Sequence, residues 1–416
     1  MIKLCMILVA VVQGSIAYAV PFEGNEIVMS GPSPHAVEAG KEIALAGGNV
    51  VDVAVAMALT LSVTSPYYAA LGGGGFALVK IQQQPVAVLD FREVAPLATG
   101  PDYFLKLDEK ASTVGGKAVA VPGIPAGLWE LHKKFGKLKW GRLFLPAEKL
   151  AKHGFRVSGE WERFTTEKKP AFTKDAVRHF FKKSGEPFLA GAILKQESLA
   201  KALFLLRGQG AKGFYEGKVA EDIVGSVRDS GGVMTLEDLK KYKVRWLKPL
   251  ETDFAGHRLY LMPPPSSGGV IIKTALALSE KAKLADKQAM SIDELHWIGE
   301  IESRSFRGRM LLGDQDFSKI PIAFLTSKSQ IDTLYESINS KKASLIKPLP
   351  DQNYESEETT HLSVLDKDGN AVAMTVTLND DYGSGVVSKQ YGVALNNQMD
   401  DFTTKPGVPN MFGLTQ

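Results

Sequence analysis

Two threonines flank a short hairpin near the end of the chain, and their hydroxyls are the first candidates for chemistry. The stretches on either side of an Asp-Gly-Asn turn alternate apolar and polar side chains, as strands with one buried face do. A turn centred on Asp368 pairs Leu365 with Ala371. The same register pairs Thr359 with Thr377, on one face of the sheet. Facing threonines are common because Thr is a good strand former, so the pair alone does not establish a catalytic site.

A threonine hydroxyl is a weak nucleophile and needs a base. His361 follows Thr359 by two residues, so it shares the same strand face and is one candidate. The other is the α-amino group of Thr359 itself, which requires a chain cut between Glu358 and Thr359. A free α-amine has an ordinary pKa of about 7.7–8.0, which suits a base near neutral pH. The polar, proline-containing stretch 339–358 is typical of an exposed linker, so it is a plausible place for such a cut.

The elements that must position this hairpin are of two kinds. Residues 35–63 are rich in Ala, Val and Leu and break at 47–49, which predicts a helix, a glycine stop and a second helix buried on all sides. A glycine run at 72–75 precedes two predicted strands, at 77–81 and 86–91. The run lacks the Lys-Ser/Thr of a phosphate-binding loop.

The middle of the chain, from about 125 to 350, predicts mainly helix. Thr235 and Ser291 each precede an acidic turn and predict helix starts. The last part of the chain predicts strands at 360–365, 371–378 and 393–395, followed by a dense polar cluster. The hairpin therefore has to pack on the helices of the first part to bury one of its faces.

Composition excludes several classes of protein. The 416 residues carry 49 basic and 46 acidic side chains, a net charge of +3, which does not supply the basic surface that nucleic-acid binding needs. The apolar run 4–12 follows Lys3 and precedes Ala17-Tyr18-Ala19, so residues 1–19 are predicted to be a signal peptide of a periplasmic or secreted protein. The only cysteine, Cys5, would leave with it, which excludes a disulfide and a Cys-based metal site in the mature chain.

A series of motifs, in order from about Gly31 to Leu414, resembles the γ-glutamyltranspeptidase family. Each motif is weak alone, whereas the ordered set is specific. The motifs are Gly72-Gly73-Gly74-Gly75-Phe76, Asp90-Phe91-Arg92-Glu93, Val121-Pro122-Gly123, Pro263-Pro264-Pro265-Ser266-Ser267-Gly268-Gly269, Leu312-Gly313-Asp314, Thr359-Thr360-His361-Leu362-Ser363-Val364, Asp368-Gly369-Asn370-Ala371-Val372-Ala373 and Asn396-Asn397-Gln398-Met399-Asp400-Asp401-Phe402.

The resemblance implies an α+β fold, a four-layer αββα sandwich of the N-terminal-nucleophile hydrolase type. It implies one precursor that cuts itself before Thr359 into a large-subunit region, residues 20–358, and a small-subunit region, residues 359–416, which stay together. The implied enzyme is a γ-glutamyl acyltransferase or hydrolase. It would take the acyl group from glutathione or a related donor and pass it to water, an amino acid or a dipeptide, without a metal or an organic cofactor.

The resemblance also implies roles for single residues. Thr359 would be the nucleophile of both self-cleavage and catalysis, with Thr377 as its supporting partner. Arg92 would bind the donor α-carboxylate, because a guanidinium fork matches a carboxylate. The remaining donor-binding residues would surround the α-amino and α-carboxylate groups, with an aspartate on the ammonium: Asn379, Gln398 and Asp401.

The sequence also departs from the family pattern. The family has a longer small subunit, so we expect a C-terminally truncated chain that lacks part of the C-terminal half of the fold, including a Ser-Ser pair and the Gly-Gly pair of the oxyanion hole. Glu358 stands where an uncharged residue is common, and Phe412 where many members have Tyr. Two alternatives remain open at this stage. One is an inactive truncated relative or one half of a split enzyme, and the other is a glutaryl-type acylase of the same superfamily.

Overall fold

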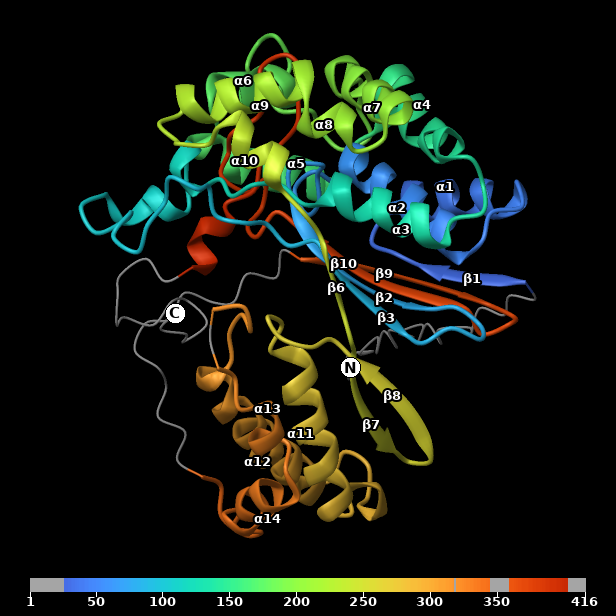
Figure 1. Ribbon diagram of the computed structural model, residues 1–416, viewed down its shortest axis with the longest axis vertical. Coiled ribbons are helices and arrows are strands. Elements are labelled where there is room, and N and C mark those ends of the chain that lie inside the picture. Colours follow the sequence, from blue (N-terminus) through green and yellow to red (C-terminus); the bar gives the residue numbers. More distant parts are fainter. Residues whose placement is uncertain (1–25, 318, 345–358, 403–416) are drawn as a thin grey trace, which may run out of the picture.

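The computed structural model describes residues 26–317, 319–344 and 359–402 of the chain (Figure 1). The predictions for the signal peptide, for Glu358 at the cleavage site and for Phe412 lie outside these residues. Within them, no helix combines the length and apolar character needed to cross a membrane.

A six-stranded antiparallel sheet lies at the centre of the described structure (Figure 1). The strands follow in the spatial order β1 (Ile27–Ser30), β9 (Thr360–Asp366), β10 (Ala371–Thr377), β2 (Gly74–Lys80), β3 (Ala87–Asp90) and β6 (Arg245–Leu247). The hairpin β9–β10 is thus inserted between strands from the first part of the chain. Residues more than 280 positions apart in sequence therefore become direct neighbours, as Thr377 and Gly74 do.

The predicted hairpin register is confirmed. Leu365 pairs with Ala371, and the ladder runs on to Thr360 opposite Val376. Strand β2 begins at Gly74, three residues earlier than predicted, because the last glycines of the run join the ladder with β10. The predicted strand at 393–395 forms only single bridges, since the chain bends through positive φ at Gly385 and Gly392 beside it.

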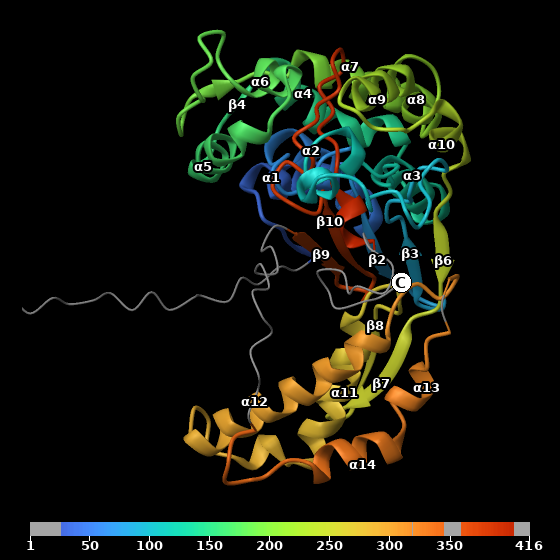
Figure 2. The same cartoon turned by 90° about the vertical axis from the view of Figure 1, so that its left-hand side faces the viewer.

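Ten helices among the described residues cover one face of the sheet (Figures 1 and 2). Helix α2 is buried along its whole length, as predicted, and packs on β9 and β10. Asn49 caps it by accepting hydrogen bonds from the backbone N–H groups of Val51 and Asp52. The ten helices are α1 (Pro34–Leu45), α2 (Val50–Thr64), α3 (Ile124–Phe135), α4 (Leu145–His153), α5 (Gly159–Lys168), α6 (Lys174–Phe180), α7 (Glu197–Gln209), α8 (Lys212–Tyr215), α9 (Gly217–Asp229) and α10 (Leu236–Lys241).

The apolar residues of the hairpin face these helices. Leu362, Val364, Val372, Met374 and Val376 are each at most 1% exposed. Burying a side chain of this size stabilises the fold by about 1.5–3 kcal/mol, so five of them fix which face of the hairpin turns inward. The alternate residues, the two threonines of the predicted site among them, are left on the opposite face.

A second lobe lies on the other side of the sheet (Figure 2). It consists of the hairpin β7 (Leu250–Phe254) and β8 (His257–Leu261) and of helices α11 (Gly268–Lys281), α12 (Ile292–Arg307), α13 (Ile322–Leu325) and α14 (Lys328–Glu336). The helix starts predicted at Thr235 and Ser291 are confirmed, since each hydroxyl caps its helix. The mainly helical prediction for the middle of the chain missed the short strands β4 (Phe155–Arg156) and β5 (Ile193–Leu194) as well as β6, β7 and β8.

Candidate active site

The two threonines meet at the open end of the central hairpin. The Oγ1 atom of Thr359 lies 3.5 Å from that of Thr377, at the outer limit of a hydrogen bond. Thr377 Oγ1 also accepts a hydrogen bond of 2.9 Å from the backbone N–H of Asn379. Asn379 has a φ of +82° and is 8% exposed, so its turn brings the backbone N–H back to the end of β10. Thr377 Oγ1 therefore accepts from both the Thr359 hydroxyl and the Asn379 backbone, as its two lone pairs allow.

His361 is occupied elsewhere. Its Nδ1 lies 2.8 Å from Thr375 Oγ1, the residue directly opposite in the hairpin. Partial burial lowers the pKa of its imidazole below the ordinary value of 6.5, so the neutral form of the ring predominates at pH 7. The structure therefore pairs His361 with Thr375 and leaves Thr359 beside Thr377.

A second cluster contains the predicted donor-binding residues. Arg92 Nη2 donates a hydrogen bond of 2.5 Å to Asp401 Oδ2, and Gln398 Nε2 donates to the same carboxylate oxygen. Residues 398–401 form a single 3-10 turn, which places Gln398 and Asp401 on the same side. Burial raises the pKa of the Asp401 carboxyl, and the neighbouring Arg92 guanidinium opposes that rise. The cluster therefore holds one cation and one carboxylate in contact.

The two clusters are joined through short contacts. Asn379 Nδ2 donates to the backbone carbonyl of Asn397, at 3.4 Å, and Gln398 follows directly in sequence. Asn397 Nδ2 also donates to the Asp380 carboxylate, at 2.7 Å, and its Oδ1 accepts from the backbone N–H of Asp380. The loop after β10 is thus tied to the turn that carries Gln398 and Asp401.

Glu93, which the sequence analysis gave no role, lies between the clusters. Its carboxylate is packed against Gly74, where an added Cβ would come within 2.3 Å of Oε2, and Gly74 pairs with Thr377 in the sheet. The side chain is 6% exposed, and in the part of the chain that the structure describes neither carboxylate oxygen has a hydrogen-bond partner on another residue. Burial raises the pKa of Glu93 to about 8, so the group is largely protonated at neutral pH.

Asn396 is the second residue that the sequence analysis left without a role. Its Nδ2 donates to the carbonyls of Gly72 and Ala120, and its Oδ1 accepts from the backbone N–H groups of Ala120 and Gln398. The residue is fully buried. It therefore ties the start of the glycine run and a loop of the helical part to the Gln398 turn. The run of two asparagines before Gln398 was the only sequence signal.

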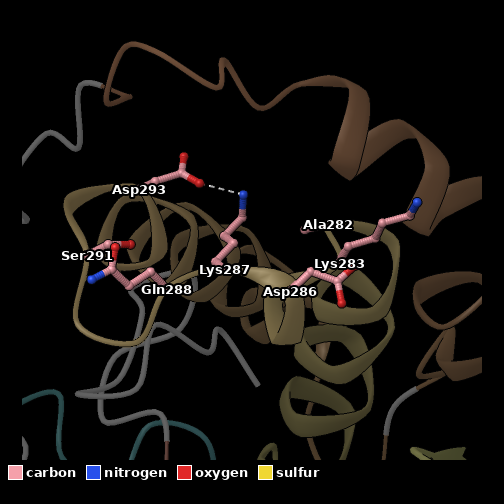
Figure 3. Close-up of a pocket in the computed structure, with 7 residues that line it drawn as sticks. All are labelled: Ala282, Lys283, Asp286, Lys287, Gln288, Ser291 and Asp293. Atoms are coloured by element: carbon pink, nitrogen blue, oxygen red, sulfur yellow. Dashed lines mark hydrogen bonds and ion pairs between the residues drawn. The ribbon is translucent and has the colours of Figure 1, made fainter.

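A hollow of about 570 Å³ lies on the second lobe (Figure 3). None of the residues of the two clusters lines it. Lys287 points toward Asp293 across it, and the two groups form an ion pair of 2.6 Å. An exposed pair of this kind contributes little and marks no site. Among the described residues, no three His, Cys, Asp or Glu side chains are grouped so as to hold a metal ion.

Comparisons with known proteins identify the family of the chain. The family model "Gamma-glutamyltranspeptidase" matches residues 36–416. The chain is 40% identical over 413 residues to a glutathione hydrolase proenzyme of Pseudomonas aeruginosa, an alignment that covers 96% of this chain and 72% of the relative.

Two solved structures are similar in fold. The γ-glutamyltranspeptidase of Helicobacter pylori superposes with a TM-score of 0.76 at 33% identity, covering 81% of this chain and all of that one. A cephalosporin acylase from Bacillus halodurans superposes with a TM-score of 0.81 at 25% identity, covering 96% of this chain and 75% of that one. These structures confirm the N-terminal-nucleophile hydrolase fold. The chain belongs to the γ-glutamyltranspeptidase family, whose members are γ-glutamyl hydrolases and transferases.

Proposed function

We propose that this chain transfers the γ-glutamyl group of glutathione and related donors, with Thr359 as the nucleophile. The proposal includes self-cleavage between Glu358 and Thr359, which separates a large-subunit region, 20–358, from a small-subunit region, 359–416. Glutathione is the substrate named for the relative in Pseudomonas aeruginosa. A periplasmic or secreted location, after removal of residues 1–19, belongs to the same proposal.

The observation that carries this proposal is the Arg92–Asp401 pair, which the Asn379–Asn397 hydrogen bond connects to the end of β10 that carries Thr377. A γ-glutamyl donor has an α-carboxylate and an α-ammonium on one carbon. Arg92 offers a planar cation for the first group and Asp401 an anion for the second. Binding would exchange the ion pair inside the protein for two ion pairs with the donor. A plain diacid has no ammonium, so the carboxylate of Asp401 favours a γ-glutamyl over a glutaryl donor.

The proposed chemistry uses the hydroxyl and the α-amine of Thr359. The α-amine of Thr359, freed by cleavage, takes the hydroxyl proton as Oγ1 attacks the γ-carbonyl carbon of the donor. The tetrahedral intermediate collapses to an acyl-threonine ester, and the leaving amine takes up the proton. Water or an amine then attacks the ester, which releases glutamate or a new γ-glutamyl compound and restores the hydroxyl. Thr377 would hold the Thr359 hydroxyl in place during both steps.

Two measurements test the proposal. On a denaturing gel, the purified chain is expected to give two fragments whose small one begins with Thr359, and Thr359→Ala is expected to stay whole. The same protein is then assayed with γ-glutamyl and glutaryl 4-nitroanilides. Release of nitroaniline from the first compound supports the proposal, whereas release from the glutaryl compound alone would favour the acylase alternative. A chain that stays uncut and turns over neither compound would contradict it.

A further inference from the structure

The segment from the end of α10 to the start of β6 contacts both backbone groups of Arg92, the carbonyl directly and the N–H through Asp90. Tyr242 donates its hydroxyl hydrogen to the Arg92 carbonyl, at 2.8 Å. The backbone N–H of Arg92 donates to Asp90 Oδ1, at 2.9 Å. The other oxygen of the Asp90 carboxylate accepts from Arg245, at 2.6 Å from Nη2 and 3.1 Å from Nε. Tyr242 and Arg245 are three residues apart, so one short segment controls both backbone groups.

Both contacts are built from well-fixed groups. The Tyr242 ring stacks on Tyr215, with ring centres 5.6 Å apart and planes inclined by 2°. The space for its hydroxyl depends on Gly123, where an added Cβ would lie 2.3 Å from the Tyr242 oxygen. Asp90 is 3% exposed and pairs with Arg245 in the β3–β6 ladder. Such contacts are stronger in a buried setting than at the surface, because water competes for them less.

The guanidinium of Arg245 also contacts the second lobe. Its Nη1 and Nη2 donate to the two oxygens of Asp314, at 3.0 and 2.8 Å, and Nη1 also donates to Asp316, at 2.5 Å. Burial alone would raise the pKa of Asp314, but the hydrogen bonds from Arg245 hold it below its ordinary value. One guanidinium thus joins the strand that precedes Arg92 to the Leu312-Gly313-Asp314 motif of the second lobe.

We propose that Tyr242 and Arg245 are positioning residues for Arg92, which set the direction of its guanidinium toward the donor α-carboxylate. The proposal rests on the function proposed for Arg92 above. Binding groups have to be held to within about 0.5 Å, and the guanidinium stands at the end of a long, flexible side chain. If the backbone of Arg92 is fixed, the side chain starts from a defined position and direction. Asp401 then has to fix only the far end.

The test is a double-mutant cycle with the γ-glutamyl 4-nitroanilide, using the full chain. Tyr242→Phe removes one hydroxyl and keeps the stacked ring, and Arg245→Met removes the guanidinium. Each is expected to raise KM about 10-fold, the size of one lost hydrogen bond to a fixed group, and to change kcat less than about twofold. In an Arg92→Met background, each is expected to change kcat/KM less than about twofold, because no guanidinium remains to be positioned.

The controls separate positioning from a general loss of structure. Arg258→Met removes an exposed arginine that pairs with Asp253 and Glu251 on the β7–β8 hairpin, and is expected to leave KM unchanged. Arg245→Lys keeps a cation beside Asp90 and is expected to recover part of the lost affinity. Equal losses in the wild-type and Arg92→Met backgrounds, or unchanged KM in Tyr242→Phe, would overturn the inference. A wild-type protein without activity would instead overturn the proposed function, and this inference with it.

Discussion

The hydroxyl oxygens of Thr359 and Thr377 lie 3.5 Å apart, on residues separated by 18 positions along the chain. The β9–β10 register brings them together, and the backbone N–H of Asn379 fixes the orientation of the second hydroxyl. The proposed nucleophile thus has a polar partner supplied by the neighbouring strand, on the sheet face away from helices α1–α10.

This contact predicts unequal effects of two substitutions at Thr377. Thr377→Ser keeps the hydroxyl and is expected to retain kcat within about fivefold. Thr377→Val keeps the shape and removes the hydroxyl, and is expected to lower kcat about 10²-fold, as loss of a group that assists proton transfer does. Steady-state kinetics with the nitroanilide measures both. The matched control is Thr375→Val, which loses only the contact with His361; an equal loss there would argue against a special role of Thr377.

The Arg92–Asp401 pair predicts a change of donor preference. Asp401→Asn keeps the size of the side chain and removes the anion that the donor ammonium needs. We expect kcat/KM for the γ-glutamyl compound to fall about 10²-fold, within the range for removing one partner of a buried charge pair. The glutaryl compound has no ammonium, so its kcat/KM is expected to stay within about threefold. Parallel losses for both compounds would refute the assignment of Asp401 to the ammonium.

The buried hydrogen bonds of Asn396 predict a large loss of stability when its side chain is removed. Asn396→Ala removes a side chain with four hydrogen bonds and takes the side-chain partner from the backbone N–H and carbonyl of Ala120, while the Gly72 carbonyl keeps the backbone N–H of residue 396. We expect the free energy of unfolding to fall by about 3 kcal/mol, since each orphaned buried group costs about 1–3 kcal/mol. Urea denaturation measures the change. The side-chain Oδ1 of the exposed Asn339 accepts from the backbone N–H groups of Lys341 and Lys342, and Asn339→Ala is expected to cost under about 1 kcal/mol. Similar losses in the two variants would contradict the structural role of Asn396.

Glu93 predicts how stability depends on pH. Burial raises the pKa of Glu93 to about 8, above its ordinary value of 4.5. Between these pH values the folded protein holds a proton that the unfolded chain has released. The free energy of unfolding therefore falls as the pH rises from 4.5 to 8, by about 1.4 kcal/mol per pH unit for this group. Below pH 4.5 the stabilisation linked to Glu93 is fully present, and above pH 8 it is lost.

The neutral isostere removes this dependence. Glu93→Gln is expected to match the wild type near pH 5 and to be the more stable protein at pH 8. Denaturation curves for both proteins across this range give the difference directly. Parallel pH profiles would show that Glu93 titrates normally in the folded protein. Such a result would leave the positions of Arg92 and Asp401 unaffected.

Local patterns in the sequence determined several features correctly. Alternation around the Asp368 turn predicted the hairpin register, because a turn fixes which residues face each other over the next few positions. The apolar run of α2 predicted a helix buried on all sides. Where strands are short, as in β6, and alternate weakly, as in β7 and β8, the pattern failed and helix was predicted instead.

The contacts of the predicted donor-binding residues depended on the tertiary structure. Arg92 and Asp401 are 309 positions apart and meet because β10 inserts beside β2. The roles of Glu93, Asn396, Tyr242 and Arg245 follow from buried polar contacts between distant segments. The sequence by itself determined the family, and it predicted the two threonines and the candidate donor-binding residues. Only the folded chain decided which side chains hold them in place, because burial and hydrogen-bond partners are properties of packing and leave no fixed spacing in the sequence.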